Sequence, residues 1–211
     1  LDEDLHAILA EIKIDDFMRK VTRKVRNLRL LRQDPWSCLC AYIISANNRV
    51  ERIDAIYKRL AQSFGEPRTV GSYRLYTFPR PQTLARCSES DLRACGAGFR
   101  APYLLEAARM VSGGLIDLAQ PGRLPYEEAR HLLKTIPGVG DKVADCVLLF
   151  AYSRYEAFPI DVWIKRTIEK VYFGSKTISM RELRQFGRDY FGRYAGYAQE
   201  YIYHYARLYG V

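Results

Sequence analysis

The sequence lacks the long apolar runs and the paired cysteines that mark membrane-spanning and disulfide-built proteins. No stretch reaches the roughly 20 apolar residues of a transmembrane helix, and we find no secretory signal, low-complexity tract or internal repeat. The five cysteines form no C-x-x-C pair. An odd number of cysteines without an export signal favours reduced thiols and an intracellular protein, in the cytoplasm, nucleoid or nucleus.

Histidine is also scarce. The three histidines have no metal-ligand spacing to the cysteines or carboxylates. An iron–sulfur cluster would need four closely spaced cysteines near the C-terminus, and no cysteine follows Cys146. We therefore expect no metal and no cofactor.

The composition is that of a large, basic protein with a well-buried core. Of the 211 residues, 48% are hydrophobic, the formal net charge is +9 and the pI is near 9.3. Such a charge favours a polyanionic partner, although a merely soluble basic surface is the alternative.

Helical periodicity and capping residues follow one another along the chain and predict an all-α fold. Pro67 to Pro81 is the only linker-like stretch, so we expect two helical lobes packed together, and no β hairpin. The predicted helices cover Asp2–Ile14, Phe17–Leu28, Pro35 to about Ser45, Val50 to about Gly65, Ser88–Gly96, Ala101–Ser112, Pro125–Ile136, Asp141–Ala151, Asp161–Phe173, Ser179–Phe191 and Ala195–Tyr209.

A tight turn, IPGVG, separates two of these helices and predicts a helix-hairpin-helix at about residues 126–151. The backbone N–H groups of Gly138, Val139 and Gly140 precede the positive end of the second helix, where a DNA phosphate can dock. An ordinary loop between two helices is the alternative interpretation.

Lys142 and Cys146 lie four residues apart on the second helix and therefore share one stripe with Leu149. The neighbouring stripe, expected to face the core, carries Val143, Val147 and Phe150. Asp161 stands just before the next helix, where a carboxylate is typically an N-cap. A capping carboxylate is held rigidly, so Asp161 can be both a cap and a catalytic group.

Four blocks, LRLLRQDPWSCLCAYIISANNRVERI, CGAGFRAPYLLEAAR, IPGVGDKVADC and YAGYAQEYIYHYAR, occur in an order that resembles the helix-hairpin-helix DNA glycosylases. Within them, the chain is most similar to the 8-oxoguanine DNA glycosylase/AP lyase group. The resemblance begins at about residue 28 and lacks the family's N-terminal β-rich domain, so the chain is either a fragment or recognises its lesion differently. It implies one glycosylase unit over residues 1–211, with the active site in a cleft between the two lobes.

The resemblance implies a bifunctional repair enzyme that binds double-stranded DNA as a monomer, with no membrane association. Such an enzyme flips a damaged nucleotide out of the duplex. Lys142 would form a Schiff base with the sugar, followed by β-elimination, and Asp161 would stabilise the developing positive charge. The expected substrate is 8-oxoguanine opposite cytosine.

The remaining predicted site residues bind the base or the DNA. Gln199 and Tyr203 lie four residues apart on the last helix, where an amide can pair with a guanine-type base and a ring can stack on it. The base pocket is expected to comprise Cys146, Phe150, Gln199 and Tyr203. The expected DNA contacts are Asn47, Asn48, Arg52, Phe99, Arg100, Gly138, Val139, Gly140, Lys142 and Trp163.

Two departures and two alternatives remain. Trp163 stands where the family commonly has a histidine that touches a phosphate, and Arg49 replaces a third asparagine. The chain could instead excise another damaged base, which Gln199 and Cys146 argue against. It could also be a non-catalytic module that binds duplex DNA through the backbone.

Overall fold

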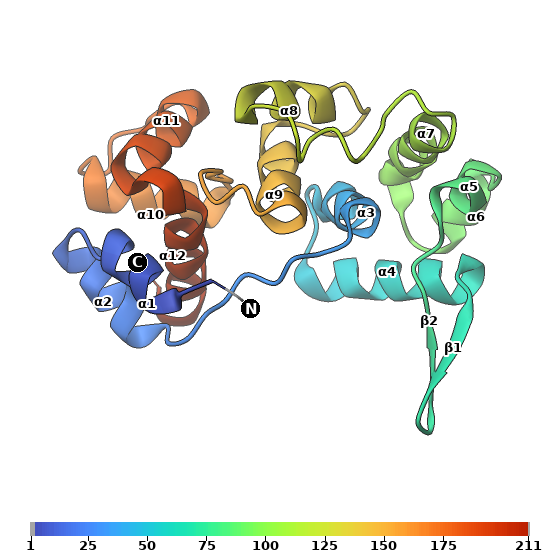
Figure 1. Cartoon of the computed structure of the whole chain (residues 1–211), viewed down its shortest axis with the longest axis horizontal. Coiled ribbons are helices and arrows are strands. Elements are labelled where there is room, and N and C mark those ends of the chain that lie inside the picture. Colours follow the sequence, from blue (N-terminus) through green and yellow to red (C-terminus); the bar gives the residue numbers. More distant parts are fainter. Residues whose placement is uncertain (1–2, 211) are drawn as a thin grey trace. The chain divides into compact units, whose positions relative to one another are not determined.

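The computed structural model describes residues 3–210 and is predominantly helical (Figure 1). The chain forms two compact units. We call residues 33–147 the central unit, and residues 1–32 together with 148–211 the terminal unit. The predicted helical fold is confirmed. Within the described residues, no helix is both long and apolar enough to cross a membrane.

The central unit begins with helices whose starts follow local capping signals. Asp34 accepts a hydrogen bond from the Ser37 N–H at 2.9 Å, and Pro35 occupies the first turn, as predicted. The helices of this unit are α3 (Pro35–Ser45), α4 (Val50–Phe64), α5 (Pro81–Ala85), α6 (Glu89–Ala94), the 3-10 helix η1 (Gly98–Arg100), α7 (Ala101–Ser112), α8 (Tyr126–Lys134) and the first part of α9 (Asp141–Tyr152).

The stretch expected to be a plain loop instead contains a two-stranded antiparallel hairpin, so that prediction was wrong. Strands β1 (Pro67–Val70) and β2 (Tyr73–Tyr76) pair with Val70 opposite Tyr73. Gly71, with φ of +59°, supplies the left-handed residue that a two-residue turn needs. The strands are short and exposed on both faces, so they lack the alternation of a half-buried strand.

The terminal unit joins the two ends of the chain. Its helices are α1 (Leu5–Ile12), α2 (Asp16–Lys24), the second part of α9, α10 (Val162–Tyr172), α11 (Met180–Phe191), the 3-10 helix η2 (Gly192–Tyr194) and α12 (Ala195–Tyr209). The predicted capping box at Ser179 and Glu182 is confirmed. Helix α1 is shorter than predicted at both ends, and Asp4 is its N-cap. Helix α2 begins directly after its N-cap Asp15 but ends at Lys24, before the predicted Leu28.

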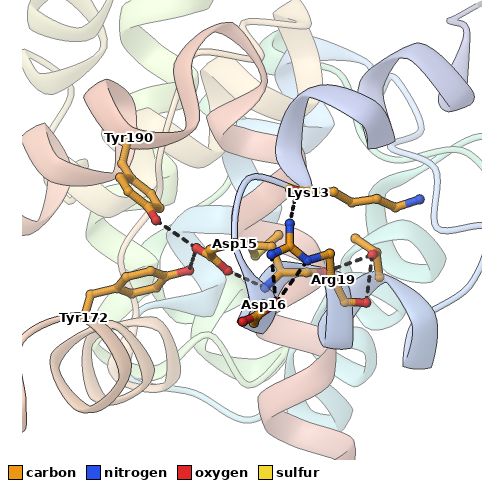
Figure 2. Close-up of polar contacts among 8 residues, drawn as sticks. Lys13, Asp15, Asp16, Arg19, Tyr172 and Tyr190 are labelled. Atoms are coloured by element: carbon orange, nitrogen blue, oxygen red, sulfur yellow. Dashed lines mark hydrogen bonds and ion pairs between the residues drawn. The ribbon is translucent and has the colours of Figure 1, made fainter.

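Asp15 ties the N-terminal segment to the C-terminal helices (Figure 2). Its Oδ1 accepts the Met18 N–H at 2.7 Å, and its Oδ2 accepts the hydroxyls of Tyr172 and Tyr190, each at 2.9 Å. Burial and the bond to Asp15 raise the pKa of both tyrosines, so they remain neutral donors. One carboxylate thus joins α2, α10 and α11.

Helix α12 packs closely on α9 within the terminal unit. A Cβ atom on Gly196 would lie 2.3 Å from Leu149 Cδ1, so only glycine fits without a shift. The Gly196 N–H also donates to the Tyr155 carbonyl at 2.7 Å. This close approach fixes the first turn of α12. Gln199 lies on the next turn of the same helix.

Candidate active site and nucleic-acid interface

The predicted helix-hairpin-helix is present as α8, a short turn and α9. Ile136 and Val139 are buried, and the Val139 N–H donates to the Ile136 carbonyl at 3.0 Å. Gly138 has φ of +83°, and a Cβ there would lie 2.7 Å from the Tyr103 ring. Glycine is therefore required at position 138 by both conformation and space.

The turn exposes two of its three expected N–H donors. Gly138 and Gly140 are exposed, and within residues 3–210 neither N–H takes part in a hydrogen bond. Val139 differs from our expectation because its N–H is committed inside the turn and its side chain is 6% exposed. The donors facing solvent are those of the two glycines, next to the positive end of α9.

A buried polar network joins α8 to α9. The Asp145 carboxylate, fully buried, accepts the Tyr126 hydroxyl at 2.8 Å and the Arg130 Nε–H at 2.9 Å. Asp141 Oδ1 lies 2.6 Å from both Arg130 Nη2 and Lys134 Nζ. The network fixes the angle at which the two helices leave the turn.

Lys142 lies on the first turn of α9 and is half-buried against α3. Its Nζ is 3.4 Å from Ser45 Oγ and 4.8 Å from the centroid of the Tyr42 ring. Because Ser45 Oγ–H donates to the Tyr42 carbonyl at 2.7 Å, its lone pair is available to the amine. Lys142 makes no ion pair with any described residue.

Cys146 lies one turn beyond Lys142 and is 4% exposed. Leu149, on the same stripe as Lys142 and Cys146, is also buried. Phe150, on the stripe expected to face the core, is half-buried. Val143 and Val147 of the second stripe are buried, as expected, and the first stripe is buried as well because α9 is packed on several sides. Among the described residues, none of the cysteines is joined in a disulfide.

Asp161 is the N-cap of α10, as predicted. Its Oδ1 accepts the Ile164 N–H at 2.8 Å, and within the described part of the chain Oδ2 accepts no hydrogen bond. The side chain is half-buried. One carboxylate oxygen is thus fixed by the helix while the other is available. Trp163, two residues on, is 43% exposed.

Gln199 lies on α12 and is 4% exposed. Its Oε1 is buried, and none of residues 3–210 donates a hydrogen bond to it. Such an acceptor is costly unless a ligand supplies a donor. Tyr203, one turn further, is half-buried; its hydroxyl accepts Arg207 Nη1–H at 3.2 Å.

The predicted asparagine pair interrupts the helices between α3 and α4, and its two members differ. The Asn48 amide donates to the Ile44 carbonyl at 3.1 Å, and its Oδ1 accepts the Arg49 N–H at 3.0 Å. Asn47 has φ of +49° and is exposed, and its side chain makes no hydrogen bond to the described residues. Asn48 therefore shapes the turn, and Asn47 projects from it.

Phe99 is 52% exposed, as expected for a side chain that could enter DNA. Arg52 is exposed as well. Arg100 is 3% exposed, and its guanidinium donates to the carbonyls of Ala46 and Asn47. Burial lowers the pKa of Arg100, and the nearby charge of Arg52 lowers it further.

The structure thus brings Lys142 against α3 and Arg100 against the Asn47 turn. The other predicted residues divide between the units: Cys146, Arg52, Phe99 and the hairpin turn belong to the central unit, and Asp161, Trp163, Phe150, Gln199 and Tyr203 to the terminal unit. Within residues 3–210, no three His, Cys, Asp or Glu side chains are grouped as metal ligands would be.

Sequence reasoning missed the groups that support this site. Tyr126, Arg130 and Lys134 recur every four residues, and Asp141 and Asp145 are four apart, so the spacing held a signal for the α8–α9 network. Ser45 carries no such signal, because its contact with Lys142 joins residues 97 positions apart.

Two helices joined by a glycine turn, with an amine on the first turn of the second helix, define a helix-hairpin-helix protein. Residues 40–191 match the family model described as HhH-GPD superfamily base excision DNA repair protein. The chain therefore belongs to the HhH-GPD superfamily.

The chain is similar in sequence to proteins named as N-glycosylase/DNA lyases. A probable N-glycosylase/DNA lyase of Methanothermobacter thermautotrophicus is 34% identical over 206 residues, which are 88% of this chain and 65% of that protein. The N-glycosylase/DNA lyase OGG1 of Arabidopsis thaliana is 28% identical, over 90% of this chain and 55% of its own length. The chain thus spans about half to two thirds of these curated relatives.

The fold is also similar to that of a solved glycosylase structure. The 8-oxoguanine glycosylase/lyase of Clostridium acetobutylicum, in complex with double-stranded DNA containing cytosine opposite 8-oxoguanine, is 34% identical with a TM-score of 0.95. The match covers 99% of this chain and 72% of that one.

Proposed function

We propose that this chain is a bifunctional DNA glycosylase that excises 8-oxoguanine opposite cytosine and then cleaves the strand at the abasic site. The observation that carries the proposal is Lys142, whose half-buried amine has a neutral hydroxyl and a ring as its contacts, beside a turn suited to phosphate. The names of the relatives support the same activity. The proposed substrate is genomic DNA, bound by a monomer inside the cell, with no cofactor.

The proposed reaction uses two side chains. With the base turned out of the duplex, the unprotonated Lys142 amine attacks C1′ of the deoxyribose while the bond from C1′ to the base breaks. Opening of the sugar ring gives an imine, loss of a C2′ proton follows, and the 3′ phosphate leaves. Asp161 stabilises the positive charge on the sugar through Oδ2, the oxygen that the helix cap leaves available.

The proposed base pocket uses Gln199 as its reading group. Its buried Oε1 requires a donor, and the Watson–Crick edge of guanine and 8-oxoguanine presents N–H groups. Tyr203 and Phe150 supply aromatic surface, and Cys146 contributes a small apolar wall.

The residues that we propose to contact the DNA are those whose backbone or side chain is exposed to solvent. The N–H groups of Gly138 and Gly140 bind a phosphate, Asn47 fills the space left by the flipped nucleotide, and Phe99 unstacks the neighbouring bases. The exposed Arg52 contacts the opposite base, and the Trp163 indole N–H replaces the phosphate contact of the family's histidine.

Borohydride trapping on lesion-containing duplex tests the proposal directly. We expect a covalent adduct with the unsubstituted chain and none with Lys142→Gln. Lys170→Gln is the control for loss of a lysine charge, because Lys170 is exposed on α10 and belongs neither to the α8–α9 network nor to the proposed site. An adduct that persists in Lys142→Gln would refute the assignment, and binding of undamaged duplex with no adduct would indicate a non-catalytic module.

Asp161→Asn separates catalysis from folding. Asparagine is as good an N-cap as aspartate, so α10 should remain intact. We expect the excision rate to fall by about 100-fold or more, the range for removing a charge-stabilising group, with little change in DNA affinity. Equal losses in affinity and rate would argue against a role on the sugar.

Gln199→Ala tests base recognition on a panel of duplexes that carry different damaged bases, with and without alkali. We expect the preference for 8-oxoguanine over other lesions to shrink, because the buried acceptor is lost. An equal loss on every lesion would contradict the reading role. Preference of the unsubstituted chain for another lesion would reassign the substrate.

A further inference from the structure

The net positive charge of the chain is concentrated in one short segment of the terminal unit. Residues 17–33 contain seven arginines and lysines and no aspartate or glutamate. They therefore supply seven of the nine net positive charges of the whole sequence. A basic protein that is merely soluble has no need to collect its excess charge in one place, so this segment is a candidate for binding a polyanion.

Helix α2 places the cations of this segment on one exposed face. Residues three or four apart share a face of a helix, so Lys20, Arg23 and Lys24 form one row, and all three are exposed. Met18 and Val21 lie on the other side of α2 and are buried. The packing of α2 in the core therefore turns the row of cations toward solvent.

We call Lys20, Arg23, Lys24 and Arg26 the basic patch. Within residues 3–210, none of these four cations forms an ion pair with a carboxylate. By contrast, Arg19 on the same helix is paired with Asp16 at 2.7 Å (Figure 2).

The cations of the basic patch are not explained by helix stability alone. Cations in the last turn favour a helix, which accounts for Arg23 and Lys24 but not for Lys20. Arg26 Nε–H donates to the Arg23 carbonyl at 3.2 Å, and its terminal nitrogens have no partner among the described residues. Like charges one turn apart repel each other, and a bound polyanion would relieve this repulsion.

Helix α12 places aromatic rings beside the basic patch. Lys20 Nζ lies 5.8 Å from the centroid of the Tyr205 ring, and Lys24 Nζ lies 5.7 Å from that of Tyr209. Successive helical residues are about 100° apart, so Tyr205 is turned by about 200° from Tyr203. The basic patch therefore adjoins a different face of α12 from the one that carries the proposed base pocket.

We propose that the basic patch binds the phosphates of a second segment of duplex DNA while the face of α12 that carries Gln199 and Tyr203 is turned toward a first. The inference rests on the proposed function only for the position of the first duplex. DNA is the polyanion that a member of a base excision DNA repair superfamily meets. A membrane surface is disfavoured, because an interfacial helix buries its apolar face in lipid, whereas α2 buries Met18 and Val21 in the protein.

The first test counts how many short undamaged duplexes one chain binds in sedimentation at low salt. We expect two duplexes per unsubstituted chain. We expect one in the patch variant, which carries Arg23→Gln, Lys24→Gln and Arg26→Gln. A control variant removes two arginines and one lysine from scattered exposed positions and should still bind two duplexes; it carries Arg86→Gln, Arg123→Gln and Lys170→Gln. One duplex per unsubstituted chain, or the same loss in both variants, would overturn the proposal.

The second test titrates a labelled undamaged duplex onto the complex that borohydride has trapped on a lesion. Each phosphate contact adds about 0.9 to the slope of log affinity against log salt, so the patch variant should lower that slope by about 2.7 and the affinity by about 100-fold at about 0.15 M salt. Arg23→Lys with Arg26→Lys keeps the charges and should retain the affinity. Unchanged slope in the patch variant would overturn the proposal, as would binding of phosphatidylserine vesicles in place of the second duplex.

Failure of the proposed function is distinguishable from failure of this inference. If borohydride gives no adduct, the proposed reaction is refuted, while the count of undamaged duplexes still decides the role of the basic patch. Circular dichroism of the patch variant checks that α2 is intact, as expected for substitutions at exposed positions.

A kinetic measurement tests the consequence of holding two segments at once. Unlabelled duplex should accelerate the release of a labelled duplex from the unsubstituted chain, because the competitor binds the basic patch before the first segment leaves. Release from the patch variant should not depend on competitor concentration. Release from the unsubstituted chain that is equally independent of competitor would overturn the proposal.

Discussion

Removal of the Asp145 carboxylate should destabilise the α8–α9 hairpin more than loss of any exposed ion pair. Asp145→Ala leaves the Arg130 side chain, only 8% exposed, without its Nε partner, and leaves the Tyr126 hydroxyl without its acceptor. Breaking a buried pair costs about 3–5 kcal/mol. Since Arg130 keeps Asp141 at 2.6 Å, we take the lower end and add about 1 kcal/mol for the hydroxyl.

The expected loss of about 4 kcal/mol is a large part of the 5–15 kcal/mol typical of a folded domain. Urea unfolding followed by circular dichroism measures it, with the m-value checked for two-state behaviour. Glu127→Ala is the matched control: its carboxylate is 54% exposed and 3.7 Å from Arg130, so we expect less than about 1 kcal/mol. Arg130→Met with Asp145→Leu should recover most of the loss. Equal effects for Asp145→Ala and Glu127→Ala would refute the reasoning.

Two further predictions concern the turn and alkaline stability. Gly138→Ala should cost about 2–4 kcal/mol in urea unfolding, from its positive φ and the Tyr103 ring 2.7 Å away, whereas Gly140→Ala, with open space around it, should cost less than about 0.5 kcal/mol. Burial and the hydrogen bond to Glu3 raise the pKa of Tyr155 from its ordinary 10 to about 12. This contribution to stability is therefore complete below about pH 10 and is lost toward about pH 12; Tyr155→Phe should flatten that decline in unfolding titrations, and an unchanged slope would contradict it.

The helical fold could be predicted because its signals are local. Asp34 with Pro35, and Ser179 with Glu182, mark helix starts through side chains that bond to backbone within three residues. The β hairpin escaped prediction because its strands are four residues long and lack a buried face, so only Gly71 and Ser72 indicated the turn.

The candidate site was predictable where a residue type acts through its own helix. Asp161 was expected as a cap because aspartate before a helical run bonds to that helix, and the structure confirms it. Arg100 was expected at the DNA surface, yet it is buried. Its partners, Ala46 and Asn47, are more than 50 positions away in sequence, and no periodicity or spacing rule links such distant residues.

In the sequence, the central unit lies between the two parts of the terminal unit, and this order determines which unit can fold first during synthesis. Residues 33–147 are contiguous, so the central unit can form as soon as they emerge. Residues 1–32 emerge earlier but must wait for residues 148–211, because Asp15 meets its tyrosine partners only then. Ile8 and Ile12 are buried in the folded protein. Until synthesis ends, they remain exposed to solvent and accessible to chaperones.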